Sequence, residues 1–324
     1  MHSAPTPDGW LLALYRYRPP GLDGAGVPVI LCHGLLSNRF NVDLYEEASL
    51  ARYLRGRGLD VWVMELRGHG GSRRETGSAR FDWTLDDYVQ RDLPSVVSYV
   101  QRATGAARVH WFGHSLGGML LYGACAIPGF ASRIQSAVVC DAPAVFGPLQ
   151  RGTRIGRAYS RLVPVVPPAM VLPFLGPAMW VAPSLLLRRH GVGNRRLALR
   201  LLANAIIPWG CSRVLADLCR ILEAGRFTSA DGRLDYEAGL SNVTFPLLVL
   251  SAARKLMDER AIKGGYEGAG SAEKSYVRLS RQEGCAEDYT HANILVSAMS
   301  SRDVYPRVAD WLLAHATDGQ NVSV

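Results

Sequence analysis

The stretch VHWFGHSLGG, residues 109–118, constrains the fold more than any other part of the sequence. An apolar run ends in Gly113-His114-Ser115-Leu116-Gly117, and the segment MLLYGACA, with the pattern of a helix, follows. The glycines let the backbone turn sharply, and a helix that begins there points free N–H groups toward the serine hydroxyl. G-x-S-x-G is a weak signal alone, but between an apolar strand and a helix start it is typical of a nucleophile elbow. We therefore predict that Ser115 is a nucleophile.

Apolar runs of strand length alternate with amphipathic segments along most of the chain. This alternation predicts an α/β fold with a mainly parallel central sheet and helices on both faces. Strands are expected at 27–36, 59–66, 108–113, 134–143, 245–252 and 275–280, and helices at 46–58, 85–105, 115–126 and 305–316.

The alternation breaks between residues 148 and 240. This segment is rich in Pro, Arg and Leu and contains no clear strand. We interpret it as an inserted helical cap, and residues 1–147 and 241–324 as the two parts of the core.

A nucleophilic serine needs a base and donors for the developing oxyanion. His291 follows the last predicted strand and precedes a helix, and the order Ser then His suits a general base. His33 and Gly34 follow the first long buried strand, where the N–H group of Leu35 can pair with that of Leu116. These two N–H groups are the predicted oxyanion donors.

Four stretches of the sequence resemble the α/β-hydrolase superfamily: CHGLLSN, LDVWVMELRGHGGSRR, DLPSVVSYVQRATGAARVHWFGHSLGG and DYTHANILV. They are most similar to the acid-lipase and polyhydroxyalkanoate-synthase-like branches. The likeness covers roughly residues 8–145 and 240–316, and it leaves the cap unmatched. It implies an α/β-hydrolase fold and a serine hydrolase that acts on an ester. The synthase branch typically carries a cysteine nucleophile, so Ser115 favours hydrolysis.

The acid of the triad is not assigned by the resemblance. Family members tend to place an Asp where this chain has Lys255, and a lysine cannot accept a hydrogen bond from a histidine N–H group. Asp141, at the end of the strand 134–143, is the first candidate, and it resembles the acid of some lipases. Asp258, three residues after Lys255, is the rival, with a helix-start carboxylate as its alternative interpretation. The third possibility is that there is no acid.

The cap carries the net charge and an unusual apolar run. All of the chain's basic excess lies between residues 151 and 200, which contain nine arginines and no Asp, Glu or Lys. Residues 162–187 are uncharged but contain six prolines, which argues against a membrane-spanning helix. The segment could be a lid over an acyl pocket or an apolar surface for an anionic membrane. Nucleic-acid binding is disfavoured, because no recognisable module accompanies the arginines.

Two classes of function remain open at this stage. The first is a serine esterase or lipase for an apolar carboxylic ester, and the second is a weakened hydrolase fold that binds a lipid or a protein partner. The sequence shows no metal constellation or phosphate loop, so no cofactor is expected. The six cysteines lack CxxC pairing and no secretory signal is evident, which predicts reduced thiols and a cytoplasmic protein. Peripheral association with a membrane through residues 151–200 stays open.

Overall fold

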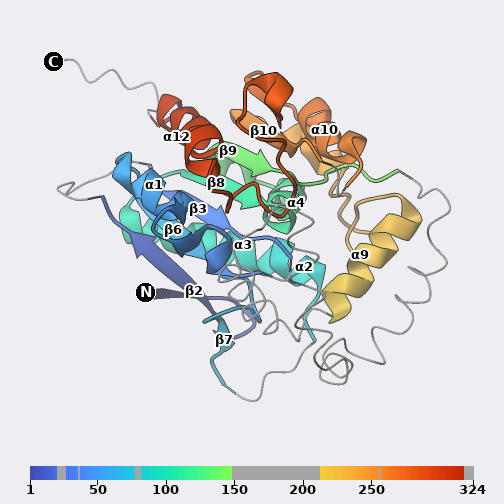
Figure 1. Cartoon of the computed structure of the whole chain (residues 1–324). Helices are drawn as coiled ribbons and strands as arrows, with labels where there is room; N and C mark the ends of the chain where they lie inside the picture. The colour runs from blue at the N-terminus through green and yellow to red at the C-terminus, as the bar shows by residue number, and fades with distance from the viewer. Residues whose placement is uncertain (20–26, 36, 77–81, 148–211, 255–256, 317–324) are drawn as a thin grey trace, which may run out of the picture.

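A computed structural model describes residues 1–19, 27–35, 37–76, 82–147, 212–254 and 257–316 (Figure 1). Its central sheet has the strand order β1-β2-β6-β3-β8-β9-β10-β11. The strands are β1 (His2–Pro5), β2 (Trp10–Tyr17), β3 (Val29–Cys32), β6 (Val61–Met64), β8 (Val109–His114), β9 (Ile134–Cys140), β10 (Leu247–Ala252) and β11 (Lys274–Leu279). The short β7 (Arg73–Arg74) pairs with β2, and β4 (Asp43–Tyr45) pairs with β5 (Ala48–Ser49) outside this sheet.

Strands β6, β3, β8, β9, β10 and β11 run parallel, and β1 and β2 add an antiparallel edge. The predicted mainly parallel sheet is therefore confirmed. Cys32 pairs with Gly113, and Cys140 pairs with both His114 and Leu250. The carboxyl ends of β3, β8, β9 and β10 consequently meet at one edge of the sheet, where side chains that follow them lie close together.

Two apolar cores cover the two faces of the sheet. Alternate residues of a strand point to opposite faces, so Ile30 and Cys32 enter one core while Val29 and Leu31 enter the other. The first core packs against α3 (Leu93–Thr104), α4 (Leu116–Ala124) and α10 (Glu259–Gly268). The second packs against α1 (Leu50–Gly56) and α12 (Tyr305–Ala314). The sheet is thus a middle layer between helices, as predicted.

The helix predicted at 85–105 is divided into three pieces. It consists of α2 (Leu85–Asp87), a π-helical segment (Tyr88–Asp92) and α3, and Pro94 lies in the first turn of α3. Proline is tolerated there because the N–H groups of a helix's first turn have no acceptor within the helix, so the missing N–H group of proline costs no hydrogen bond. The predicted helix at 46–58 is also shorter than expected, because Ser49 caps α1 by accepting the N–H group of Arg52.

The predicted cap lies between β9 and β10, and residues 148–211 of it are outside the described residues, as are the apolar run 162–187 and its nine flanking arginines. The described part opens with α9 (Ser212–Ala224), which contacts α2. Asp217 of α9 accepts the N–H group of Leu85 at 3.0 Å, so α9 is tied to the start of α2. Short 3-10 turns, among them Ala238–Asn242 and Arg281–Glu283, and α11 (Ser300–Asp303) complete the described elements.

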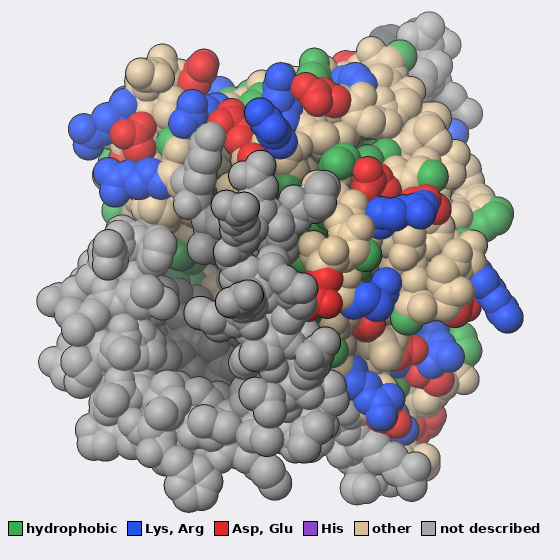
Figure 2. All heavy atoms as spheres, turned by 90° about the vertical axis from the view of Figure 1, so that its right-hand side faces the viewer, with side chains coloured by type: hydrophobic (Ala, Val, Ile, Leu, Met, Phe, Trp, Pro, Cys, Tyr) green, Lys and Arg blue, Asp and Glu red, His purple; other side chains and the backbone are tan. Residues whose placement is uncertain are grey.

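Charged side chains of both signs share the described surface. Figure 2 shows Lys and Arg among Asp and Glu over the described part of one face. This mixing agrees with a basic excess that the sequence concentrates in 151–200. Within the described residues, no helix is both long enough and apolar enough to cross a membrane.

Candidate active site

Ser115 occupies a strained turn between β8 and α4. Its φ and ψ are 52° and −118°, a region that non-glycine residues rarely adopt. Its backbone N–H group donates to Cys140 O at 2.9 Å, which fixes the turn against β9. A Cβ at Gly117 would lie 2.5 Å from Cys32 O, and one at Gly113 would lie 2.4 Å from the Gly117 carbonyl carbon. Both glycines of the motif are therefore required by close packing, as expected for a nucleophile elbow.

Asp141 also has a positive φ, of 48°, and it shares this property only with Ser115 among the described non-glycine residues. It follows β9 directly, and its side chain is 2% exposed. One carboxylate oxygen accepts the N–H group of Ala252 at 2.8 Å, and the other lies 2.6 Å from His291 Nδ1. The carboxylate is thus held between the end of β10 and the His291 ring.

His291 lies in the turns that follow β11, with 16% of its side chain exposed. A carboxylate only accepts hydrogen bonds, so Nδ1 of His291 carries the proton toward Asp141 and Nε2 is left as the basic nitrogen. The ring also stacks on His114, the residue before Ser115, with 4.8 Å between the ring centroids. His291 therefore lies beside the elbow.

The rival acid candidate has a different role in the structure. Asp258 is exposed and is the N-cap of α10, where its carboxylate accepts the N–H group of Arg260 at 3.0 Å. This matches its interpretation as a helix-start carboxylate. Lys255, which stands at the family's usual acid position, lies outside the described residues. The contact to His291 Nδ1 comes from Asp141.

The turn after β3 is held by a buried histidine. His33 Nδ1 donates to Gly34 O at 2.8 Å, while its Nε2 accepts the N–H group of Leu66 at 3.2 Å. Gly34 approaches the elbow closely, since a Cβ there would lie 3.2 Å from Ser115 Cβ. In the described part of the chain, the N–H groups of Leu35 and Leu116 donate to no other residue. Their role as oxyanion donors stays a prediction.

Buried histidines with lowered pKa values give the protein an expected pH dependence of stability. Burial lowers the pKa of His33 to about 3, that of His69 to about 4 and that of His110 to about 3, and charge on His69 adds to the effect at His33. Unfolded histidines titrate near pH 6.5. Between pH 6.5 and 4 the unfolded chain therefore binds more protons, and the free energy of unfolding falls as the pH falls. Each histidine contributes a slope of about 1.4 kcal/mol per pH unit.

Urea denaturation at pH 7 and pH 5 measures this slope. The variant His110→Gln should show a shallower dependence, because one of the buried neutral histidines is removed. Equal stability of the wild type at the two pH values would contradict the expectation.

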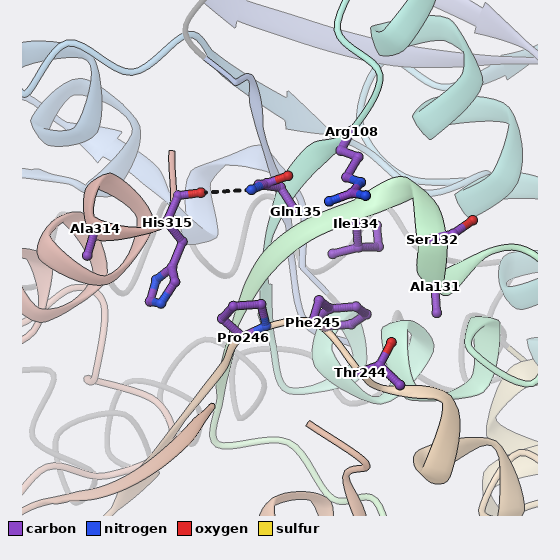
Figure 3. Close-up of a pocket in the computed structure, with 10 residues that line it drawn as sticks. All are labelled: Arg108, Ala131, Ser132, Ile134, Gln135, Thr244, Phe245, Pro246, Ala314 and His315. Carbon is purple, nitrogen blue, oxygen red and sulfur yellow. Dashed lines mark hydrogen bonds between the residues drawn. The ribbon is translucent and has the colours of Figure 1, made fainter. Parts of the chain in front are cut away.

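The pocket in Figure 3, of about 450 Å³, is not part of this site. It is lined by residues at the amino ends of the strands, including Arg108 before β8, Ile134 of β9 and Pro246 before β10. Ser115 and Asp141 lie at the opposite, carboxyl ends of these strands. Elsewhere, the described residues contain no group of three or more His, Cys, Asp or Glu that could hold a metal ion.

Comparisons with known proteins show the fold of the chain and the family that part of it matches. A sequence profile described as "alpha/beta hydrolase fold" matches residues 27–159, which include the β3 turn, the elbow and Asp141. The thermophilic esterase from Thermogutta terrifontis superposes with a TM-score of 0.62 over 98% of both chains at 16% identity. A putative aryl esterase from Burkholderia cenocepacia gives a TM-score of 0.63 at 21% identity, over 96% of this chain and 99% of its own. Residues 27–159 therefore match the α/β-hydrolase family, and the chain has the α/β-hydrolase fold.

Within this superfamily the chain is similar to lipases. It is 30% identical to Triacylglycerol lipase 2 of Arabidopsis thaliana over 151 residues, which are 43% of this chain and 36% of the relative. It is 34% identical to the Gastric triacylglycerol lipase of Bos taurus over 128 residues, 36% of this chain and 32% of the relative. The match therefore spans about a third of each curated relative. It supports a hydrolase of the lipase and esterase type.

Proposed function

We propose that this protein is a serine hydrolase that cleaves apolar carboxylic esters through an acyl-enzyme on Ser115. The observation that carries the proposal is the 2.6 Å contact between Asp141 and His291, beside the strained turn at Ser115. A buried carboxylate on Nδ1 fixes the tautomer in which Nε2 can accept a proton. Asp141 is the proposed acid.

Each step of the proposed reaction uses a group of this chain. His291 Nε2 takes the proton of the Ser115 hydroxyl as its oxygen attacks the ester carbonyl carbon. The N–H groups of Leu35 and Leu116 hold the oxyanion of the tetrahedral intermediate. When the intermediate collapses, the C–O bond to the alcohol breaks and His291 returns the proton to the leaving oxygen. Water, activated by His291, then cleaves the acyl-enzyme to give the carboxylic acid.

Two features support an apolar, lipid-like ester as the substrate. The relatives matched over the core are named triacylglycerol lipases, and the uncharged run 162–187 flanked by arginines suits contact with an acyl chain or an anionic membrane surface. The alternative, a weakened hydrolase fold that binds a lipid or a partner, rests on Lys255 at the position of the usual acid. The contact of Asp141 with His291 favours the enzymatic proposal over this alternative.

Labelling with a fluorophosphonate tests the nucleophile directly. We expect one covalent adduct per wild-type chain, mapped to Ser115, and no adduct on Ser115→Ala. A matched control is Ser251→Ala, because Ser251 is buried near the end of β10, close to Asp141, and its hydroxyl contacts the Ala252 carbonyl and the Tyr276 side chain, not Asp141 or His291. That variant should label as wild type does. Absence of an adduct on folded wild-type protein, with detergent or lipid present to open any lid, would reject the proposal.

A further inference from the structure

His114 connects the elbow to two loops that come from different parts of the chain. Its Nδ1 lies 3.0 Å from Asn41 Oδ1, and its Nε2 lies 3.2 Å from the carbonyl oxygen of His291. Asn41 Oδ1 also accepts the N–H group of Gly34 at 3.1 Å. His114 thus stands between the turn that supplies Leu35 and the loop that carries His291.

The two contacts of His114 cannot both be hydrogen bonds while its ring is neutral. Each contact places a ring nitrogen against an oxygen that only accepts, so each needs a proton on that nitrogen, and a neutral imidazole carries one. Turning the Asn41 amide round does not help, because its NH₂ group would then face the N–H group of Gly34. Only one of the two contacts can therefore be a hydrogen bond.

The surroundings of His114 keep its ring neutral. The residue is 6% exposed, and burial together with charge on His291 holds its pKa well below the ordinary histidine value. The titratable side chains that affect it are His291, which it stacks against, and the buried His33. A protonated His114 would also oppose the imidazolium that forms on His291 during proton transfer.

The hydrogen-bond partners favour the proton on Nε2. Within the described residues, His114 is the one donor to the His291 carbonyl, whereas Asn41 Oδ1 already accepts from Gly34. A proton on Nε2 therefore leaves both oxygens with a donor. A proton on Nδ1 would give Asn41 Oδ1 a second donor and leave the His291 carbonyl without one, which costs free energy in a half-buried site.

We propose that His114 is a positioning residue for the base. In its neutral Nε2–H tautomer, His114 donates a hydrogen bond to the carbonyl group of His291. This bond holds the imidazole of His291 against the ring of His114. The proposal rests on the proposed function in that His291 is taken as the base. His114, the motif residue between Gly113 and Ser115, then has a defined role. It connects the end of β8, next to Ser115, to the loop that carries His291, which follows the predicted cap in the sequence.

Nitrogen NMR of histidine-labelled wild-type protein tests the tautomer without any need for activity. Comparison with His114→Gln assigns the His114 resonances. We expect a protonated Nε2 and an unprotonated Nδ1, unchanged between pH 8 and pH 6. A proton on Nδ1, or on both nitrogens, would overturn the proposal.

A pair of substitutions tests the positioning role. Gln can place an amide N–H near the position of Nε2, so His114→Gln keeps a donor for the His291 carbonyl. Asn is shorter and reaches only the position of Nδ1, so His114→Asn loses that donor. We expect fluorophosphonate labelling of His114→Gln to stay within about threefold of wild type and that of His114→Asn to fall by about 10- to 100-fold at saturating probe, with the half-saturating probe concentration unchanged.

The control is His110→Gln, which alters another buried histidine of β8, bonded to Ser136. It should lower stability but leave the labelling rate unchanged. Equal labelling of the Asn and Gln variants at position 114 would reject the positioning role, whether both are fast or both are slow. If the proposed function fails, wild type does not label at all, and the NMR result still decides the tautomer of His114.

Discussion

Replacement of Asp141 by Asn is expected to lower ester turnover by about 10⁴-fold. One carboxylate oxygen accepts a hydrogen bond from the Nδ1–H group of His291 at 2.6 Å, and the other accepts one from the Ala252 N–H group. An amide in its place can present NH₂ to Nδ1, which favours the tautomer that has its proton on Nε2. That nitrogen can then no longer accept the Ser115 proton. Initial rates with a p-nitrophenyl ester, on protein shown to be folded, measure the loss.

The matched control is Asp258→Asn. Asp258 caps α10 through the N–H group of Arg260, and Asn is an equally good N-cap residue. Turnover should therefore remain near the wild-type value. A large loss in Asp258→Asn with normal turnover in Asp141→Asn would assign the acid to Asp258. Normal turnover in both variants would remove the acid from the mechanism.

Gly117→Ala is expected to have the largest effect on stability. The added methyl group would lie 2.5 Å from Cys32 O and 2.9 Å from His33 O, both backbone atoms that cannot rotate away. Overpacking of this kind costs about 3 kcal/mol at the upper end of its usual range. The relief of the clash must also separate α4 from the turn after β3, so activity should fall in the protein that remains folded. Thermal and urea unfolding give the first effect, and turnover gives the second.

Gly56→Ala provides the comparison for this substitution. Gly56 is exposed at the end of α1, and a Cβ there meets nothing within 4 Å. Alanine is the better helix former, so stability should rise by up to about 1 kcal/mol. If Gly117→Ala unfolds at the same denaturant concentration as Gly56→Ala, the close approach at Gly117 does not limit the fold.

The parallel part of the sheet could be predicted from the sequence because all of its strands except β11 consist of buried residues. Val29, Ile30, Leu31 and Cys32 are completely buried, and the continuous apolar runs of the other central strands are equally easy to recognise. The antiparallel edge was not predicted. Strands β1 and β2 lie on the edge of the sheet, where half-buried positions weaken the apolar pattern.

The choice between Asp141 and Asp258 could not be made from the sequence because it depends on strand neighbours. Counting along the loop after β10 leads to Lys255 and Asp258, whereas the contact to His291 comes from the next strand in the sheet, β9. Positions 141 and 291 are separated by the whole cap, and no local pattern links them. The positive φ of Asp141 fits the tolerance of Asp for that conformation, but it is visible only in the structure.

The contacts of His114 could not be predicted from the sequence either. The motif gives its place beside Ser115 but not the direction of its ring. Asn41 lies in a short 3-10 turn (Arg39–Asn41), seven residues after Gly34, with no spacing that marks it as a partner. Such polar contacts depend on how loops return to the sheet, which the apolar pattern does not encode.

The pairing of His114 with Cys140 has a consequence for how such a chain can diverge. Ser115 and Asp141 each follow one member of this pair, so the ladder between β8 and β9 sets their separation. The segment from 148 to 240 follows both residues in the sequence. Exchange, lengthening or shortening of that segment would leave the spacing of Ser115 and Asp141 unchanged. In a chain built in this way, the insertion can change while the geometry of the proposed catalytic residues stays the same.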